Sequence, residues 1–323
     1  MPSLKRALFL LCLSTLALGS SRYRMFGEWH RVFTHPIISP RGEGWESAGT
    51  FNPAVTVHNG KIVMLYRAQD KAGTSRLGYA ESSDGLDFTR LPNPVLSPET
   101  QYEAGGGIED PRLVKIGDTY YLTYTGYNKK DAQLCLALSK DLRSWERKGV
   151  ILPAYHGKWN VGWTKSGAIV PTKIDGKYWM YWLGTSADKT DQMGLAYSND
   201  LTHWTEALDS PVLPRRPGKF DSRVVEPGPP PMLTPNGIVL VYNGADDSLT
   251  YRTGVAVFDL KDPRKLLSRT DQPIFSPAME WERVGQVPNV VFVEGMVRRG
   301  SEYLFYYGAA DKYIGVARAP IEP

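Results

Sequence analysis

The chain has 323 residues, enough for one or two domains, and its 42% hydrophobic and 22% charged residues are ordinary for a globular protein. The formal net charge is +4, and the Lys and Arg residues are scattered without a basic run, so the charge pattern of a nucleic-acid-binding protein is missing. The 9 Trp and 18 Tyr residues outnumber the 10 Phe residues. Their flat rings can stack on sugars, but β-rich cores use them as well.

The N-terminus has the order of a secretion signal. Lys5 and Arg6 precede a mainly apolar stretch over residues 7–18, and small residues follow at 19–21. This order predicts a signal peptide over residues 1–20 and a secreted, periplasmic or extracellular mature protein with no membrane attachment. An uncleaved anchor is the alternative, although the apolar stretch is short for a membrane span. Removal of the signal takes Cys12 with it and leaves Cys135 alone, so we expect no internal disulfide.

The rest of the chain repeats with a period of roughly 60 residues. An aromatic strand is expected at each of residues 61–67, 120–124, 177–182, 238–242 and 303–307, and each follows a turn that contains glycine. A short apolar segment follows each strand and ends at Ala80, Ala137, Ala196, Ala256 or Ala317. Turns rich in Ser and Asp that end in an aromatic residue follow three of the alanines, at 83–88, 139–145 and 198–204. We expect these turns to be structural, with the aromatic residue filling the gap between repeats.

Each repeat predicts four antiparallel strands, which is one blade of a propeller. Five repeats therefore predict an all-β, five-bladed β-propeller that forms a single catalytic domain over residues 21–323. The last repeat runs out of sequence at the C-terminus, so we expect the segment 28–40 to supply its missing strand and close the ring.

The inner strand of each blade would line the central axis, so its polar residues are the site candidates. One candidate from each repeat forms a regular series: Asn52, Asp110, Lys165, Glu226 and Glu294. Carboxyl groups that share one channel perturb one another's pKa, so one can stay protonated as an acid while another stays ionised. Glycoside cleavage uses such a pair. Arg67, Arg112 and Lys165 would hold the carboxylates ionised or bind an anion.

The run Gly-Ile-Glu-Asp-Pro-Arg at 107–112, followed by an aromatic strand, resembles glycoside hydrolase family 130. The stretches 165–171, 226–230 and 306–311 resemble it too, and the resemblance extends from Asn52 to Ala317. That family comprises phosphorylases and hydrolases of β-mannosides on a five-bladed propeller. The resemblance implies that Asp110 is the general acid and passes its proton through a hydroxyl of the mannosyl unit. It also implies that no metal or other cofactor is needed, and that the sugar or an anion is bound by Asn52, Arg67, Arg112, Lys165 and Asp311.

The nucleophile separates two versions of this reaction. A phosphorylase needs a cluster of cationic donors for phosphate, whereas an inverting hydrolase needs a carboxylate base and room for one water. Glu226 and Glu294 are candidate bases and would repel phosphate, so we expect a secreted inverting hydrolase of β-linked mannosides. The alternative is a β-mannoside phosphorylase with inorganic phosphate as co-substrate, whose anion site would use Arg67, Arg112, Lys165 and His156.

Three other functions stay open. Arabinan- or fructan-cleaving propellers resemble this chain, but they use an Asp on the first blade where this sequence has Asn52, and an amide cannot act as the base. A non-catalytic carbohydrate-binding propeller and a protein-binding scaffold are the other two. The sequence does not indicate the linkage, the acceptor sugar, the exo or endo mode, or the oligomeric state.

Overall fold

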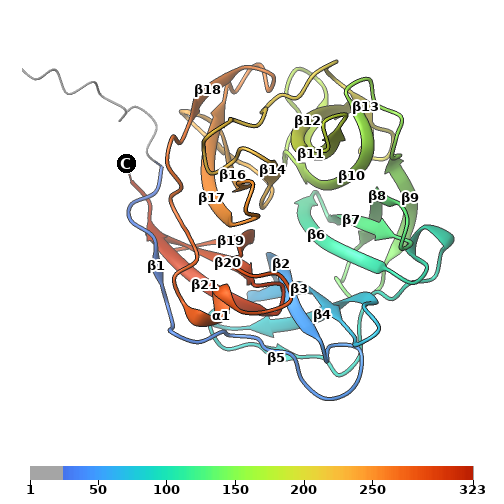
Figure 1. Ribbon diagram of the computed structural model, residues 1–323, viewed down its shortest axis with the longest axis vertical. Coiled ribbons are helices and arrows are strands. Elements are labelled where there is room, and N and C mark those ends of the chain that lie inside the picture. The colour runs from blue at the N-terminus through green and yellow to red at the C-terminus, as the bar shows by residue number, and fades with distance from the viewer. Residues whose placement is uncertain (1–24, 323) are drawn as a thin grey trace, which may run out of the picture.

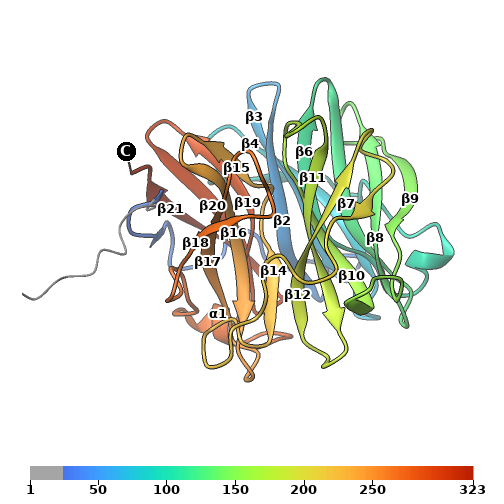
Figure 2. The ribbon, with the colours of Figure 1, turned by 90° about the horizontal axis from the view of Figure 1, so that it is seen from above.

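The computed structural model describes residues 25–322, so the predicted signal peptide and Cys12 lie outside the described residues. Among residues 25–322, no helix is long and apolar enough to cross a membrane. The described residues form five antiparallel blades around a common centre (Figure 1), and Figure 2 shows their long strands running from one face of the ring to the other. The predicted all-β, five-bladed propeller is therefore confirmed.

The strands of each blade are given in order from the axis outward. Blade 1 contains β2 (Gly49–His58), β3 (Lys61–Gln69), β4 (Ser75–Ser82) and β5 (Thr89–Arg90); blade 2 contains β6 (Gly107–Ile116), β7 (Thr119–Tyr127), β8 (Ala132–Ser139) and β9 (Glu146–Leu152); blade 3 contains β10 (Asn160–Ile169), β11 (Tyr178–Ser186), β12 (Asp191–Ser198) and β13 (Thr205–Glu206); blade 4 contains β14 (Val224–Pro227) and β15 (Met232–Thr234), then β16 (Gly237–Ala245), β17 (Tyr251–Phe258) and β18 (Leu266–Arg269); blade 5 contains β19 (Val291–Arg299), β20 (Glu302–Ala309), β21 (Tyr313–Pro320) and β1 (His30–Arg31). Two short helices, η1 (Gln101–Glu103) and α1 (Glu280–Arg283), precede the inner strands of blades 2 and 5.

The N-terminal strand closes the ring, as the sequence predicts. β1 pairs antiparallel with β21, with His30 opposite Arg318 and Arg31 opposite Ala317. The ring of Trp29 stacks on Phe305 of β20 with centroids 3.6 Å apart. Blade 5 is thus built from both ends of the described chain, and the outer edge of β21 is covered.

The repeated alanines mark a feature that the sequence pattern did not reveal. Four of these alanines, on the third strand of their blades, lie opposite an arginine of the outer strand, in the pairs Ala80–Arg90, Ala137–Arg147, Ala256–Arg269 and Ala317–Arg31. Each arginine contacts a buried carboxylate that also accepts a hydrogen bond from a tyrosine of the second strand. We call each set a blade clamp; the four are Arg90–Glu46–Tyr66, Arg147–Glu103–Tyr124, Arg269–Asp221–Tyr242 and Arg31–Glu282–Tyr307.

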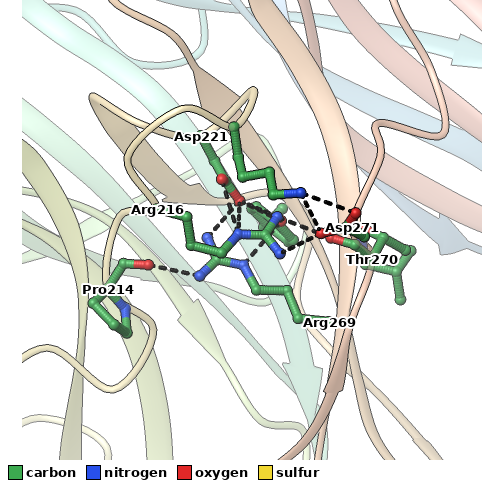
Figure 3. A network of polar contacts seen from close by, with 9 residues as sticks. Pro214, Arg216, Asp221, Arg269, Thr270 and Asp271 are labelled. Atoms are coloured by element: carbon green, nitrogen blue, oxygen red, sulfur yellow. Dashed lines mark hydrogen bonds and ion pairs between the residues drawn. The ribbon is translucent and has the colours of Figure 1, made fainter.

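The clamp of blade 4 is shown in Figure 3. Asp221 has no exposed surface and lies 2.6 Å from Nη2 of Arg269 and 2.7 Å from Nη2 of Arg216. Arg269 also donates to the carbonyl oxygen of Pro214 at 2.6 Å, and Arg216 donates to that of Thr270 at 2.9 Å. The clamp therefore fixes the loop of residues 214–222 against β18.

Blade 3 has no such clamp. Ala196 lies opposite Glu206 instead of an arginine, and Trp182 occupies the place of the tyrosine, opposite Gly194. Asn160, at the start of β10, is fully buried. Within residues 25–322, neither polar atom of the Asn160 side chain has a hydrogen-bond partner, and the same holds for Nε1 of Trp182.

The Ser- and Asp-rich turns are structural, as predicted. In the first, Ser82 Oγ accepts from the amide of Gly85 at 2.8 Å and Asp84 Oδ1 accepts from that of Leu86 at 2.8 Å. The aromatic residue that ends the turn, Phe88, contacts Tyr306 of blade 5 edge to face at 5.8 Å. The turn thereby joins blade 1 to blade 5.

Replacing the central carboxylate of a clamp should destabilise the whole ring. Asp221→Ala leaves Arg216 and Arg269 close together without their shared counter-charge, and removal of one partner from a buried ion pair costs about 3–5 kcal/mol. Urea denaturation monitored by tryptophan fluorescence would measure this loss. Asp188→Ala is the matched control, because Asp188 is exposed and its pair with the partly exposed Arg215 should contribute less than about 1 kcal/mol. Equal losses in the two variants would contradict the clamp.

Candidate active site

The inner strands bulge where their polar side chains gather. Pairing with the second strand shifts register after Phe51 in β2, after Glu109 in β6, after Lys165 in β10 and after Val293 in β19. Asn52, Asp110 and Ser166 lie at three of these bulges with φ of 50°, 50° and 59°. A positive φ is uncommon for residues other than glycine and is typical of functional positions held by the surrounding structure.

The predicted series of matching positions is correct in part. Asn52 and Asp110 lie at equivalent bulges, and Glu294 lies at a bulge one position further along its strand, after Val293, which is opposite Tyr307. Lys165 and Glu226 lie one position earlier along the strand. Their cross-strand partners show this: Lys165 lies opposite Leu183 and Glu226 opposite Asn243, residues that directly follow Trp182 and Tyr242, respectively. In blade 2 the same position belongs to Glu109, opposite Thr125. Since a slip of one residue reverses the face of a strand, the residue of blade 2 that matches Lys165 and Glu226 is Glu109 and not Asp110.

Asp110 is held by two neighbouring side chains. Nδ2 of Asn52 donates to Asp110 Oδ1 at 2.7 Å, and Nη1 of Arg67 donates to the same oxygen at 2.9 Å. Nη2 of Arg67 lies 2.5 Å from Glu109, so one guanidinium binds two adjacent carboxylates. Burial alone would raise the pKa of Asp110, but the charges of Arg67 and Lys165 and the bond from Asn52 help to lower it to about 2. Asp110 is therefore ionised in the unliganded protein.

Arg112 supports the site from behind. Its Nη1 donates to the Asp110 carbonyl oxygen at 3.0 Å, and its Nη2 and Nε donate to the carbonyl oxygens of Pro227 and Gly228 at 2.7 and 3.3 Å. The guanidinium also lies within 4 Å of the carboxylates of Glu226 and Glu294. Only 1% of its surface is exposed, whereas the resemblance implied contact with a sugar or anion.

Glu226 and Glu294 differ, although the sequence made both candidate bases. Glu226 is 7% exposed and accepts a hydrogen bond from Ser166 Oγ. Burial raises its pKa to about 7, against the lowering effects of Arg112 and Ser166. Glu294 has no exposed surface, and neither of its oxygens has a hydrogen-bond partner within residues 25–322. Burial raises the pKa of Glu294 well above its ordinary value, so Glu226 is the carboxyl group better suited to take a proton from a nucleophile.

Lys165 and Asp311 complete the predicted set, and both are partly exposed. No hydrogen bond or ion pair within the described chain involves the Lys165 ammonium, which lies 5.1 Å from the ring centre of Trp163. Its charge acts on Glu109, Asp110 and Glu226, so it faces the carboxylates. Burial raises the pKa of Asp311 to about 6, while Arg67 opposes this shift.

All the predicted site residues therefore gather at one place. We call this group, with Glu109 and Ser166 added, the axial cluster; its members are Asn52, Arg67, Glu109, Asp110, Arg112, Lys165, Ser166, Glu226, Glu294 and Asp311. Within residues 25–322, no set of three His, Cys, Asp or Glu side chains is arranged to hold a metal ion.

Two further residues near the cluster were missed by sequence reasoning. Asp191 accepts from Thr185 Oγ1 at 2.6 Å, and burial raises its pKa. Tyr251 is partly exposed, and burial together with the charges of Glu226 and Asp311 raises its pKa. Both begin the third strand of their blades, where no motif marks them, whereas Glu109 and Ser166 stand beside residues that the sequence had already indicated.

A five-bladed propeller with carboxyl groups of strongly different pKa at its axis has the architecture of a carbohydrate-active enzyme. The family model of glycoside hydrolase family 130, described as β-1,4-mannooligosaccharide phosphorylase, matches residues 29–323. The chain belongs to glycoside hydrolase family 130, as the sequence motifs indicated.

Individual relatives act on β-mannosides. The chain is 41% identical to a 1,2-β-oligomannan phosphorylase of Thermoanaerobacter sp. (strain X514), over 89% of this chain and 95% of the relative. It is 27% identical to the β-1,2-mannobiose phosphorylase of Listeria innocua solved with β-1,2-mannobiose, with a TM-score of 0.81 and coverage of 91% and 97%. A third similar structure comes from work on family 130 glycoside hydrolases that target β-1,2-mannosidic linkages in Candida mannan. The chain is 37% identical to it, with a TM-score of 0.83 and coverage of 94% of this chain and 98% of that one. The named activities of the curated relatives support the phosphorylase alternative better than the expected hydrolase, which stays a prediction.

The stability of the protein should fall as the pH rises from about 4.5 to about 7. The pKa of Glu226 rises from an ordinary 4.5 to about 7 on folding, so the native protein binds this proton more tightly than the unfolded protein does. The resulting contribution to the free energy of unfolding is complete below pH 4.5 and is lost as the pH rises through about 7. Urea denaturation at a series of pH values would show the slope, which Glu226→Gln should reduce. Glu146→Gln, at an exposed carboxylate, is the control. An unchanged slope in Glu226→Gln would contradict the shifted pKa.

Proposed function

We propose that the protein cleaves β-1,2-linked mannosides at the axial cluster. The family is shown by the match over residues 29–323, and the cluster contains the paired carboxyl groups that glycoside cleavage uses. The β-1,2 linkage is proposed because the relatives reported above are named for that linkage.

We propose further that water is the nucleophile, and the charge of the axial cluster carries this proposal. The cluster has five carboxyl groups, namely Glu109, Asp110, Glu226, Glu294 and Asp311, against the three cations Arg67, Arg112 and Lys165. Arg67 is bound to Glu109, Asp110 and Ser75, and Arg112 is bound to three carbonyl oxygens. Of these three cations, only Lys165 has no hydrogen bond or ion pair within the described residues, so a phosphate dianion would find one unoccupied cation among several carboxyl groups.

Phosphorolysis is the second candidate, and the 41% identity to a named phosphorylase favours it. In that reaction Lys165 would bind the phosphate, which would be the co-substrate. Its neighbour Arg67 would have to exchange a carboxylate for phosphate, because its three nitrogens are already bonded. His156, the fourth member of the anion site considered from the sequence, is exposed on the loop before β10.

In the hydrolytic reaction, Asp110 and Glu226 act as a pair. The carboxylate of Glu226 takes a proton from water as the water oxygen bonds to the anomeric carbon, and the glycosidic bond breaks. The leaving oxygen gains the proton from Asp110, through a mannosyl hydroxyl in the route that the family resemblance implies. The unliganded cluster favours the opposite distribution, with Asp110 ionised and Glu226 near half-protonated at pH 7. The pair therefore carries a proton that must pass to Asp110 when the substrate binds.

The other members of the cluster position the substrate. Asn52 and Arg67 orient Asp110, and Lys165 and Asp311 face the bound sugar. Arg112 is a positioning residue, because it contacts the backbone beneath Asp110 and the carboxylate of Glu226. Secretion remains part of the proposal and rests on residues 1–20, which suit an enzyme that acts on extracellular glycans.

The products of β-1,2-mannobiose, with and without inorganic phosphate, would identify the reaction. Free mannose formed without phosphate is the expected result. Mannose 1-phosphate formed only with phosphate would replace hydrolysis by phosphorolysis. Binding without turnover under both conditions would indicate a carbohydrate-binding propeller.

Substitutions of Asp110 and Glu226 should show which carboxyl group acts as the general acid and which acts as the base. We expect Asp110→Asn to lose about 10²–10⁴-fold in kcat on mannobiose but much less on an aryl β-mannoside with a good leaving group, because that substrate needs no proton from the acid. Glu226→Gln should lose activity on both substrates and regain turnover with azide, which needs no base. Ser166→Ala should move the limb of the pH–rate profile that reports Glu226 upward, because the bond from Ser166 lowers the pKa of Glu226. The reverse pattern of leaving-group dependence would exchange the two roles.

A further inference from the structure

Three aromatic side chains near the axial cluster have no part in the proposed reaction: Trp163, which lies beside Lys165, and two tyrosines that contact Trp163. We call Tyr127, Tyr155 and Trp163 the aromatic platform. Tyr127 ends β7 of blade 2, Trp163 belongs to β10 of blade 3, and Tyr155 lies in the loop between these blades. Tyr155 is 54% exposed, which is unusual in a chain whose other large aromatic clusters pack within and between blades.

Polar and ring contacts hold the platform in place. Nε1 of Trp163 donates to the Tyr155 hydroxyl at 3.2 Å, and that hydroxyl donates to Asp131 Oδ1 at 2.9 Å. The rings of Tyr127 and Trp163 lie 5.8 Å apart at 59°. The backbone amide of Tyr155 bonds to the carbonyl oxygen of Gly162 at 2.7 Å, and its φ is 66°. An exposed ring with this many restraints is already ordered before any ligand arrives, so its binding costs little conformational entropy.

The platform is continuous with the axial cluster. Trp163 precedes Lys165 by two residues on β10, and the Lys165 ammonium lies 5.1 Å from the ring centre of Trp163. The same ammonium helps to lower the pKa of Asp110. Exposure rises along this line from Asp110, at 7%, through the partly exposed Lys165 and Trp163, to Tyr155. A chain that enters the buried end at Asp110 would leave along these rings.

We propose that the aromatic platform is a binding surface for the leaving-group side of a mannooligosaccharide, where it stacks the third and later sugars. The C–H faces of a pyranose match the faces of Trp and Tyr rings, and the Tyr155 hydroxyl and Asp131 offer hydrogen bonds to sugar hydroxyls. This inference rests on the proposed cleavage of mannosides and is independent of whether water or phosphate is the nucleophile. The enzyme then prefers chains longer than a disaccharide.

Kinetics on β-1,2-linked di-, tri- and tetrasaccharides, assayed with and without phosphate, would test the platform. We expect kcat/KM of the wild type to rise with chain length. Trp163→Ala should lower kcat/KM for the tetrasaccharide by about 5–20-fold, mainly through KM, while the value for the disaccharide stays within about twofold. Tyr155→Ala should also lower kcat/KM for the tetrasaccharide. Trp163→Phe should retain part of the rise in kcat/KM with chain length.

Tyr178→Ala is the matched control, since Tyr178 is a partly exposed aromatic residue at the opposite end of β11 from the platform. It should leave the kinetics of every substrate unchanged. Equal losses on the di- and tetrasaccharide, or no loss on either, would overturn the platform while disaccharide turnover by the wild type still supports the proposed function. If the wild type turns over no mannoside at all, the proposed function is wrong and this inference falls with it.

Discussion

The buried guanidinium of Arg112 is the interaction on which the rest of the site depends. It joins the backbone of blade 2 at Asp110 to that of blade 4 at Pro227 and Gly228, and it faces the carboxylates of Glu226 and Glu294. Blades 2, 4 and 5 are therefore held at one point beneath the site. Because a buried cation needs counter-charges, the acidic character of the axis and the burial of Arg112 require each other.

Charges and hydrogen bonds, rather than burial, give the carboxyl groups of the axis different protonation states. Asp110 accepts bonds from Asn52 and Arg67 and stays ionised, while Glu226 and Glu294, closer to Arg112 but less fully bonded, hold their protons more firmly. The blade clamps use the same chemistry for stability, with each central carboxylate bonded by an arginine and a tyrosine.

The sequence was sufficient to predict the fold, because the alanine period and the glycine turns are local signals of strand and hairpin. It also indicated Asn52 and Asp110, which lie at bulges inside recognisable motifs. It could not place Lys165, Glu226 and Glu294 correctly, since register is set by cross-strand pairing and not by residue spacing along the chain. The burial of Arg112, the clamps and the positions of Asp191 and Tyr251 arise from contacts between distant segments, and no local pattern records such contacts.

Blade 3 has no clamp, and yet it supplies Lys165, Ser166 and Trp163. Its buried Asn160 and Trp182 side chains leave polar atoms unbonded within the described residues, and the loop before β10 lacks the arginine and tyrosine bonds that fix the corresponding loop in the other four blades. Local opening free energies vary across a fold according to such differences. The blade that contacts the substrate would then be the one whose local opening costs the least free energy. Binding of the sugar and rigidity of the ring would therefore be thermodynamically linked.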